Sequence, residues 1–316
     1  MTEVVGPDAE GLRRAVQILR AESVVAFPTE TVYGLGAHAF SAKAIAEVYR
    51  LKRRPSWNPL IVHVDSVQAA RELAEVWPAY ADDLAARFWP GPLTLVVERL
   101  RRLGDVGRTA AGTIAIRIPA HPIALELLAA SGLPLAAPSA NRSESISPTT
   151  AQHVIQSLPD VPLVIDGGPS GWGIESTVLD LTSSPPRLLR PGALPLRALR
   201  EAIGAITLPE QDLTDGVARS SPGMSRRHYA PRATLILTEA IEPNGHTGPV
   251  GVLAYQGTAG PLREVLPADA REYAADLYAA LHRLDDAGAA TILVQPPPPT
   301  EDWLAVRDRL TRAAAG

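Results

Sequence analysis

The sequence predicts a mixed α/β fold in two unequal parts. Short apolar runs rich in Val, Ile and Leu alternate with segments of helical periodicity up to about Ile206. Several of these runs are separated by turns rather than by helices, which favours a twisted mixed sheet flanked by helices over a strictly parallel one. After a segment without periodicity the pattern resumes, and it predicts a second, smaller α/β unit.

Each expected element has its own local signal. Expected strands are short and apolar and lie between Gly, Pro or Asp residues, whereas expected helices carry apolar residues three and four positions apart. The expected strands of the first part are 23–27, 59–64, 92–98, 113–119, 134–138, 161–168, 176–181 and 186–192. The expected helices there are 41–52, 66–76, 121–130, 149–158 and 196–204. In the second part we expect strands over 233–239, 249–255 and 290–295 and helices over 268–288 and 302–315.

The two parts are joined by a segment with no regular pattern. Residues 208–232 are rich in Gly, Pro, Ser and charged side chains, which is typical of a linker or a long ordered loop. The expected organisation is therefore a first domain over 1–207, a linker over 208–232 and a small C-terminal α/β domain over 233–316.

Composition excludes several kinds of site. The 316 residues include no cysteine, which removes disulfides, thiol nucleophiles and cysteine-ligated zinc and suits a reducing compartment. The net charge of −4 gives no overall attraction to nucleic acid or to an anionic membrane, although a local basic groove stays open. No apolar run is long enough to span a bilayer, and the acidic N-terminus lacks the apolar core of a secretory signal. We therefore expect a cytoplasmic protein with no membrane partner.

A basic cluster at the end of the helix over 41–52 is the first candidate site. Lys52, Arg53 and Arg54 close that helix, and a proline then forces the chain out before Asn58 leads into the next strand. This rigid setting for three cations and an amide favours an anion site, although a helix C-terminus stabilises cations in any case. Only two of the 30 basic residues are lysines, and lysine is a compact ammonium with an adjustable pKa. Lys52 therefore has either a specific role or a chance position.

Polar side chains on two expected strands mark the second candidate. In the strand over 113–119, three isoleucines take one face and Thr113, Ala115 and Arg117 take the other. The small alanine leaves a ledge between a hydroxyl and a guanidinium, which suits a carboxylate or a phosphate; a surface ion pair is the alternative. His63, in the strand over 59–64, is either a site residue or a structural one.

Loops of small polar residues follow other expected strands. The stretch "FPTETVYGLG" puts Thr29 and Thr31 on the same side of the chain after a buried strand. Serines recur from Ser139 to Ser147, and the segment 166–176 is rich in glycine. Such residues expose backbone N–H groups to a ligand, but they also form ordinary turns. Neither a P-loop nor a dinucleotide-binding fingerprint occurs.

Taken together, these motifs resemble one family. "FPTETVYGLG", "LKRRPSWNPLIVHV", "WPGPLTLV", "TIAIRIPAHPIALELL", "PLAAPSAN", "GIESTVLDL", "LLRPG" and "HYAP" occur in this order. They resemble the threonylcarbamoyl-AMP synthases, the YrdC-type enzymes of tRNA t6A biosynthesis, in their long two-domain form. The resemblance covers about Val24 to Pro231, and it implies a YrdC-like sheet in the first domain and a Rossmann-like second domain. The C-terminal part is identified mainly by its position and size.

The resemblance implies a nucleotidyltransferase that condenses L-threonine, bicarbonate or CO2, and ATP. The carboxylated threonine amine attacks the α-phosphate, pyrophosphate leaves, and threonylcarbamoyl-AMP passes to the tRNA threonylcarbamoyl-transfer complex. Mg2+ is expected as a cofactor held mainly through the ATP phosphates, without a metal site made by the protein. Direct tRNA binding is compatible with this function but is not required.

Matching the motifs residue by residue implies three sets of site residues. The set for L-threonine is Thr31, His63, Arg117, Ala137 and Ser176. The set for ATP is Arg54, Asn58, Thr113, Ser139, Ser147, Arg190 and Tyr229. The catalytic signature is Lys52, Arg54, Ser139 and Asn141. Because Tyr229 belongs to the linker, the resemblance also implies that residues 208–232 cross the cavity as a lid that excludes water.

Two other functions stay open on the sequence alone. A module that binds double-stranded RNA would use the basic groove, and its affinity would fall steeply with salt. A carbamoyl-transfer maturation factor would use a related domain. Such factors resemble fusions with cysteine-rich zinc motifs, however, and the absence of cysteine argues against this alternative.

Overall fold

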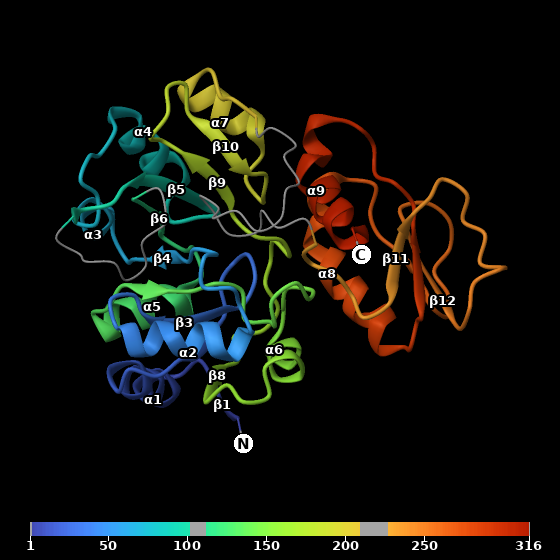
Figure 1. Ribbon diagram of the computed structural model, residues 1–316, viewed down its shortest axis with the longest axis horizontal. Helices are drawn as coiled ribbons and strands as arrows, with labels where there is room; N and C mark the ends of the chain where they lie inside the picture. The colour runs from blue at the N-terminus through green and yellow to red at the C-terminus, as the bar shows by residue number, and fades with distance from the viewer. Residues whose placement is uncertain (1, 102–111, 209–226, 316) are drawn as a thin grey trace.

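The structure is a computed structural model that describes residues 2–101, 112–208 and 227–315. The chain forms a larger N-terminal unit and a smaller C-terminal unit that lie side by side (Figure 1). The predicted α/β class, with a mixed sheet and a second, smaller α/β unit, is confirmed. Most of the expected lid, residues 209–226, lies outside the described ranges. Within those ranges no helix is long and apolar enough to cross a membrane.

The first unit is built on one ten-stranded mixed sheet. Its strands are β1 (Glu3–Val5), β2 (Val25–Phe27), β3 (Gly34–His38), β4 (Ile61–His63), β5 (Leu93–Glu98), β6 (Thr113–Arg117), β7 (Leu135–Ala136), β8 (Leu163–Ile165), β9 (Thr177–Asp180) and β10 (Arg187–Arg190). Their order across the sheet is β1-β8-β2-β3-β7-β4-β6-β5-β9-β10. The β4–β6 and β5–β9 pairs are parallel, whereas β2–β3, β5–β6 and β9–β10 are antiparallel. Successive pairs from β2 to β4 are antiparallel, and from β4 to the β10 edge parallel and antiparallel pairs alternate.

Helices cover the sheet on both faces. They are α1 (Ala9–Arg20), α2 (Ala42–Lys52), α3 (Val67–Arg71), α4 (Ala79–Phe88), α5 (Pro122–Ser131), α6 (Ala151–Ser157) and α7 (Leu196–Ile203). Val25 and Phe27 of β2 pack in one core with α1 and α5, whereas the alternate residue Ala26 joins a second core with α2, α4, α6 and α7. The short strands are thus buried on both faces, which is why they are almost wholly apolar.

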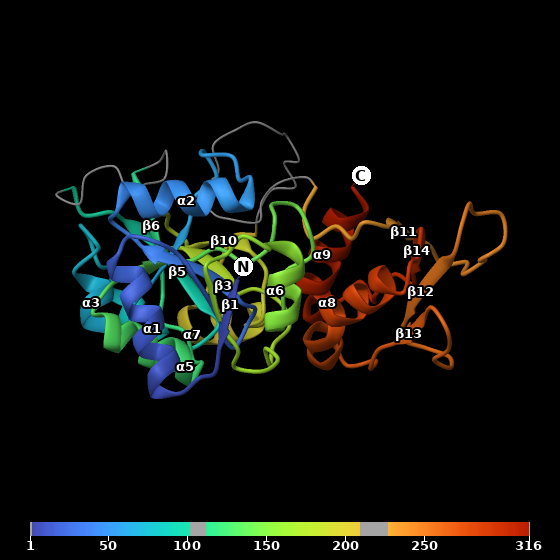
Figure 2. The same ribbon diagram turned by 90° about the horizontal axis from the view of Figure 1, so that it is seen from below.

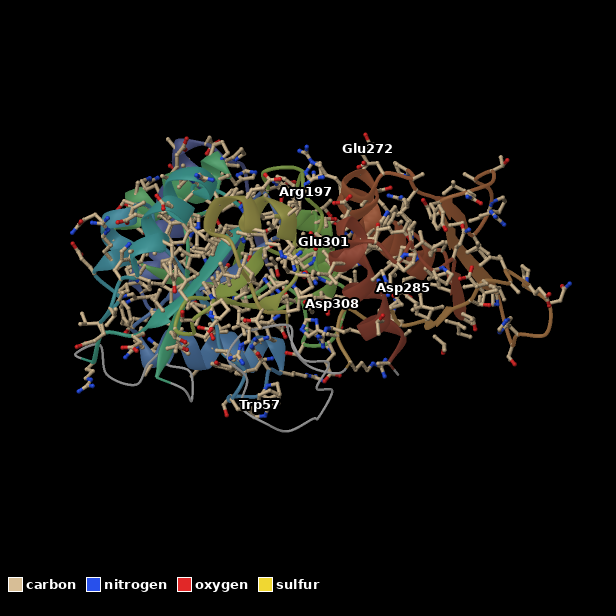
Figure 3. The ribbon with its side chains drawn as sticks, turned by 90° about the horizontal axis from the view of Figure 1, so that it is seen from above. Trp57, Arg197, Glu272, Asp285, Glu301 and Asp308 are labelled. Atoms are coloured by element: carbon tan, nitrogen blue, oxygen red, sulfur yellow. The ribbon has the colours of Figure 1, made fainter. Side chains whose placement is uncertain are left out.

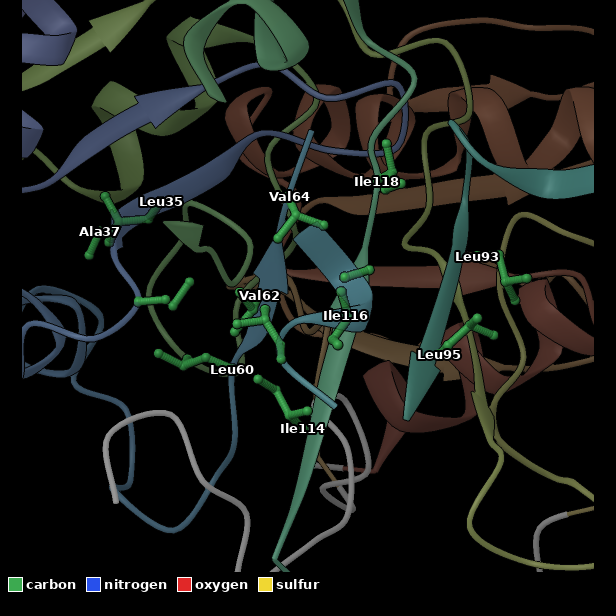
Figure 4. Packing of buried hydrophobic residues seen from close by; sticks show 14 of the residues in the cluster. Leu35, Ala37, Leu60, Val62, Val64, Leu93, Leu95, Ile114, Ile116 and Ile118 are labelled. Atoms are coloured by element: carbon green, nitrogen blue, oxygen red, sulfur yellow. The ribbon is translucent and has the colours of Figure 1, made fainter. Parts of the chain in front are cut away.

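The predicted alternation of side chains in β4 and β6 is confirmed. Figure 4 shows the inward-facing side chains packed together: Leu60, Val62, Val64, Ile114, Ile116 and Ile118. Ile61 and Ala115 lie in a small cluster on the other face of the sheet. In the parallel register His63 lies directly opposite Arg117, so the two polar side chains reach the same face at the same height.

Strand β3 and several other elements were not expected. The glycines of "YGLG" belong to this central strand rather than to a loop. A Cβ atom on Gly36 would lie only 2.6 Å from the Phe27 ring. Only glycine lets the β3 backbone pass so close to an aromatic side chain. The helix expected over 66–76 ends at Arg71. Helices α1 and α4 and strand β1 are additions to the expected list.

The C-terminal unit is a parallel sheet with its helices on the side of the first unit (Figures 1 and 2). Its strands are β11 (Thr234–Leu237), β12 (Val250–Ala254), β13 (Arg263–Val265) and β14 (Thr291–Val294), in the order β11-β14-β12-β13. Its helices are α8 (Ala270–Asp286), the short 3-10 helix η2 (Glu301–Trp303) and α9 (Leu304–Ala314). Every pair of strands in it is parallel, as the Rossmann-like expectation requires.

The two units share one apolar core, in which Val32, Ile146 and Ile174 of the first unit pack with residues of α8 and α9. Gly173 allows the closest approach, since its φ is +67° and a Cβ atom there would lie 2.1 Å from the Ala275 carbonyl oxygen of α8. This glycine therefore serves helix packing, whereas the sequence left the glycines of residues 166–176 open between a ligand loop and an ordinary turn. Figure 3 shows Glu301 and Asp308 where α9 and η2 meet the first unit.

Replacing Gly173 with alanine should weaken the association of the two units. The added methyl group meets backbone, and the left-handed conformation is strained for alanine, so we expect Gly173→Ala to lower the free energy of unfolding by about 2–4 kcal/mol. Gly171→Ala is the matched control, because a Cβ atom there meets nothing within 4 Å. Urea denaturation followed by circular dichroism measures both variants, and equal midpoints would contradict this account.

Candidate active site

One cavity gathers polar residues from segments far apart in the sequence. Its described lining is Thr29, Thr31, Val32, Tyr33, Gly34, Arg54, Ile61, His63, Arg117, Ala137, Pro138, Ser139, Glu175, Ser176, Arg190, His228 and Tyr229. These residues come from the loop between β2 and β3, the start of β3, the loop after α2, both ends of β4, the C-terminal ends of β6 and β10, the loops that follow β7 and precede β9, and residues 228–229. The sheet brings these loops together because it places the ends of its central strands side by side.

The structure places most, but not all, of the predicted site residues on this lining. All five residues predicted for the threonine pocket are there: Thr31, His63, Arg117, Ala137 and Ser176. Four of the predicted ATP contacts also line it: Arg54, Ser139, Arg190 and Tyr229. The predicted residues outside the described lining are Lys52, Asn58, Thr113, Asn141 and Ser147. Thr113 lies at the opposite end of β6 from Arg117. Of the two side chains expected to form a ledge, only Arg117 is therefore on the described lining.

The Arg117 guanidinium is held on three sides. Nη1 donates a hydrogen bond to the Thr31 hydroxyl at 3.0 Å, and Nε donates one to the Gly91 carbonyl at 3.2 Å. Nη2 forms an ion pair of 2.7 Å with the Glu30 carboxylate, and both side chains are nearly buried. Thr31 is fixed in turn by a 2.8 Å hydrogen bond between its hydroxyl and that of Thr29. The guanidinium thus already holds one carboxylate, that of Glu30, in a fixed orientation.

His63 contributes a neutral imidazole beside this guanidinium. Its side chain is buried, and Nδ1 has no hydrogen-bond partner among the described residues. Burial, with the positive charge of Arg117, lowers the pKa of His63 to about 3. The ring is therefore uncharged at neutral pH and offers a ligand a polar contact without adding a further positive charge.

Arg54 is the one side chain of the expected basic cluster that reaches the cavity. Its Nη2 donates hydrogen bonds to Asn58 Oδ1 at 2.6 Å and to the Pro59 carbonyl at 2.9 Å. Burial lowers the pKa of Arg54 to about 10. Arg53, which ends α2 in a left-handed conformation with φ of +50°, is exposed to solvent. The three neighbouring cations thus diverge, and they do not form the single anion site that the sequence favoured.

Lys52 is buried beneath the cavity. Its Nζ donates hydrogen bonds to the Ser139 carbonyl at 2.6 Å and to the Asn141 carbonyl. Burial lowers the pKa of Lys52 well below its usual value. The Asn141 side chain donates to the Arg142 and Ser145 carbonyls, each at 2.8 Å. In this structure Lys52 and Asn141 shape the loop that carries Ser139, and neither side chain lies on the cavity surface.

The turn before β9 places a buried acid next to predicted substrate contacts. Ser176 Oγ accepts a hydrogen bond from Arg190 Nη2 at 3.1 Å and lies 2.8 Å from the Thr94 hydroxyl. Glu175, one residue earlier, accepts a 2.5 Å hydrogen bond from the Ser147 hydroxyl. Ser147 thus contacts the cavity wall through Glu175, although it does not line the cavity itself.

Two kinds of site residue were missed by the sequence analysis. Glu30 and Glu175 each lie one position from a predicted contact, and this position inside a polar motif could have identified them as site residues. Arg309 of α9 is 1% exposed, and Tyr278 of α8 is also buried; both contact Glu175. Arg309 shares the buried face of its helix with apolar residues, and a charge on such a face was the available signal.

The described end of the linker reaches the cavity. Tyr229 is buried in a left-handed conformation with φ of +62°. Its ring lies 4.0 Å from the ring of His228 and 4.9 Å from the guanidinium carbon of Arg309. Residue 229 is therefore fixed by contacts with both units. The remainder of the expected lid stays a prediction.

Comparison with known proteins gives matches over the whole chain. A family model described as telomere recombination matches residues 17–192, and one described as the C-terminal domain of threonylcarbamoyl-AMP synthase matches residues 195–315. The threonylcarbamoyl-AMP synthase of Pyrococcus abyssi is 40% identical over 96% of this chain and 94% of its own. That of Bacillus subtilis is 40% identical over 100% of this chain and 96% of its own. The crystal structure of P. abyssi Sua5 complexed with L-threonine superposes with a TM-score of 0.91 at 38% identity, covering 99% of this chain and 97% of that one.

The depressed pKa of His63 makes a prediction about stability in acid. The unfolded chain binds a proton at His63 below about pH 6.5, whereas the folded chain binds it only near pH 3. The stability that the folded protein gains from a neutral His63 is therefore fully present above pH 6.5, and it is lost as the pH falls toward 3. We expect His63→Gln to reduce the slope of unfolding free energy against pH between pH 6 and 4 by about 1.4 kcal/mol per unit.

Guanidinium denaturation at closely spaced pH values measures this slope. Between pH 7 and 8 neither the folded nor the unfolded chain takes up the proton, so the two proteins should have the same slope there. An unchanged slope between pH 6 and 4 would show that His63 becomes charged in the folded protein.

Proposed function

We propose, since this chain belongs to the family of threonylcarbamoyl-AMP synthases, that it condenses L-threonine, bicarbonate or CO2, and ATP into threonylcarbamoyl-AMP and pyrophosphate. The family follows from two family models that together cover most of the chain and from full-length relatives at 40% identity. The observation that carries the proposal for this site is that all five residues predicted for L-threonine line one cavity together with Arg54 and Arg190.

The binding of threonine would use the end of the cavity around Arg117. The guanidinium already lies against a carboxylate, that of Glu30, and its Nη1 donates to Thr31. The threonine carboxylate would share or replace the contact with Glu30, and the neutral His63 would lie beside it. A bidentate contact of this kind fixes the position and the direction of the amino acid at once.

The ATP phosphates would lie against the cations on the other side of the same cavity. The amine of threonine attacks CO2 and loses a proton, or attacks bicarbonate with release of water, and becomes a carbamate. The carbamate oxygen then attacks the α-phosphate as the bond to pyrophosphate breaks. Arg54 and Arg190 would offset the negative charge that gathers on these oxygens, and the Ser139 hydroxyl lies on the same lining. The reaction needs placement and charge neutralisation more than a strong base.

Mg2+ would be held by the phosphates and by water rather than by a protein cage. Among residues 2–101, 112–208 and 227–315, no three His, Asp or Glu side chains gather closely enough to hold a metal ion. Glu175, the acid on the described lining, is already hydrogen-bonded by Ser147, Tyr278 and Arg309. The ion would supply further neutralisation of the triphosphate when it is bound.

A cytoplasmic location and transfer of the product to the tRNA threonylcarbamoyl-transfer complex are further parts of the proposal. Threonylcarbamoyl-AMP is a reactive mixed anhydride, so a short transfer to the tRNA-modifying complex in the cytoplasm limits its hydrolysis. The lack of cysteine suits that compartment.

Substrate-dependent release of pyrophosphate tests the function. With ATP, Mg2+ and bicarbonate, we expect addition of L-threonine to increase pyrophosphate release and to produce threonylcarbamoyl-AMP detectable by mass spectrometry. Release that does not depend on threonine would contradict the proposal. Binding of double-stranded RNA that weakens steeply with salt and is unaffected by ATP would instead favour a nucleic-acid-binding module.

A substitution at Arg117 tests the threonine end of the cavity. Lysine keeps the charge but loses the fork, and a hydrogen bond to a charged group contributes about 1.5–3 kcal/mol, so we expect Arg117→Lys to raise the KM for threonine by roughly 10–150-fold. The KM for ATP should change little. Arg187→Lys is a suitable control, because Arg187 lies half-exposed in an ion pair with Asp180. An unaltered KM for threonine would remove Arg117 from the pocket.

A further inference from the structure

A single carboxylate on the cavity lining is gripped by the C-terminal unit. Glu175 is 6% exposed, and its Oε2 accepts hydrogen bonds from Arg309 Nε at 2.8 Å and from the Tyr278 hydroxyl at 3.0 Å. Its Oε1 accepts the hydrogen bond of the Ser147 hydroxyl. Arg309 comes from α9 and Tyr278 from α8, so two of these three donors belong to the second unit.

The same two side chains support other parts of the cavity wall. Arg309 Nη1 donates a 2.8 Å hydrogen bond to the Pro191 carbonyl, directly after Arg190 in the chain. The guanidinium also lies over the Tyr229 ring, which lies 5.8 Å from the ring of Tyr278 in a nearly parallel orientation. Arg309 therefore contacts three segments that contribute to the cavity lining: the Glu175 turn, the end of β10 and the linker.

These contacts lead mainly to residues predicted to bind ATP; of the threonine set only Ser176 adjoins them, next to Glu175 in the chain and hydrogen-bonded by Arg190. Ser147, Arg190 and Tyr229 were all predicted to bind ATP. Ser147 is held by Glu175, Arg190 precedes the carbonyl that Arg309 binds, and Tyr229 lies beneath the guanidinium. The residues that hold Arg117 are of another origin: Gly91, Thr31 and Glu30 all belong to the first unit. The second unit thus touches the side of the cavity assigned to ATP.

The negative charge of Glu175 indicates that its contacts with Arg309 and Tyr278 do more than pack the two units together. Glu175 is the one acidic side chain on the described lining, and an ionised carboxylate there would repel a triphosphate. Burial favours the protonated form, but Arg309, Arg190 and the Ser147 hydroxyl outweigh it and lower the pKa of Glu175 to about 2. The carboxylate stays charged, so it needs a cation. If Arg309 did not supply one, Arg190 would be drawn to Glu175 and away from the phosphates.

A purely structural role is the competing explanation, since buried ion pairs often do no more than join two surfaces. The interface also contains an ion pair away from the cavity, between Arg200 of α7 and Glu301 of η2, with both side chains 40% exposed. That pair connects the same two units without touching the cavity lining. The Arg200–Glu301 pair is therefore a control for an ion pair that only connects the two units.

We propose that Arg309 and Tyr278 are positioning residues for the ATP site. They neutralise and orient Glu175, and in this way they keep Arg190 and Tyr229, both on the cavity lining, placed for the triphosphate. The second unit therefore completes the ATP side of the cavity, whereas the first unit alone builds the threonine side around Arg117. This inference rests on the proposed function for the identity of the two ligands.

Equilibrium binding to the full-length chain separates the two explanations. Isothermal titration calorimetry measures the Kd for ATP with Mg2+ and the Kd for L-threonine in each variant. We expect Arg309→Met to raise the Kd for ATP at least 10-fold and to change that for threonine less than 3-fold. Tyr278→Phe, which removes one hydrogen bond and leaves the charge paired, should raise the Kd for ATP about 2–5-fold. Arg200→Met, the control at the remote ion pair, should match the unaltered protein.

The double variant Arg309→Met with Glu175→Gln gives the sharpest test. Removing the carboxylate together with its counter-charge leaves no unpaired acid, so ATP affinity should return to within about 3-fold of the original value. A role confined to joining the units predicts the reverse, because the double variant would then lose at least as much as either single one. That result, or an equal loss of affinity for ATP and threonine, would overturn the inference.

Two further measurements keep the test decisive. If Arg309→Met gives no cooperative thermal transition, Arg309→Lys replaces it; lysine keeps the charge but cannot bind both Glu175 and the Pro191 carbonyl, so a selective loss of ATP affinity is still expected. An equal loss for both ligands in a folded Arg309→Lys would overturn the inference. Pyrophosphate release by the unaltered chain tests the reaction separately, so a failure of the proposed function is seen there and not in these binding differences.

Discussion

The pairing of two parallel strands determines what the cavity can bind. His63 of β4 lies opposite Arg117 of β6, and strand geometry ties both to the apolar residues between them. Because Val62 and Ile116 must face the core, the histidine and the arginine must face the cavity. A slip of one residue in either strand would exchange the two faces and bury a guanidinium in the core, at a large cost in stability. The same core packing that holds the sheet together therefore places a guanidinium and a neutral imidazole side by side on the cavity lining.

Buried charge is the second theme of the structure. Lys52, Arg54, Arg117, Arg190 and Arg309 are each less than 9% exposed. Removing a cation from water is costly unless it is paired, and main-chain carbonyls, hydroxyls or carboxylates of the described chain accept at least one hydrogen bond from each of these five side chains. A cavity lined in this way is arranged before any ligand arrives, which lowers the cost of ordering when two anions bind next to each other. The acid at its edge is balanced mainly from the second unit, and this gives the two-unit architecture a chemical reason.

The sequence allowed good prediction where local pattern determines the outcome. Alternating branched residues placed Arg117 and His63 on one face correctly, and motif order placed the threonine contacts on one cavity. Strand β3 was missed because Gly34 and Gly36 disfavour strands, and the sequence does not reveal that the Phe27 ring leaves no room for a Cβ atom at position 36. Lys52 was expected near a ligand, since the sequence does not reveal that two main-chain carbonyls lie above it. Arg309 could not be paired with Glu175, because the partners lie 134 positions apart and helical periodicity carries no information over that distance.

The scarcity of lysine combines with the burial of Lys52 in a way that has practical value. Lys43 is exposed near the start of α2, whereas Lys52, at the other end of the same helix, is 1% exposed and engaged with two carbonyl oxygens. Amine-reactive dyes, biotin esters or activated resins would therefore attach at Lys43 and at the chain terminus. Arginine, which these reagents do not attack, supplies the other 28 basic side chains. The molecule can thus be tethered or made fluorescent by ordinary coupling chemistry while its interior stays chemically untouched.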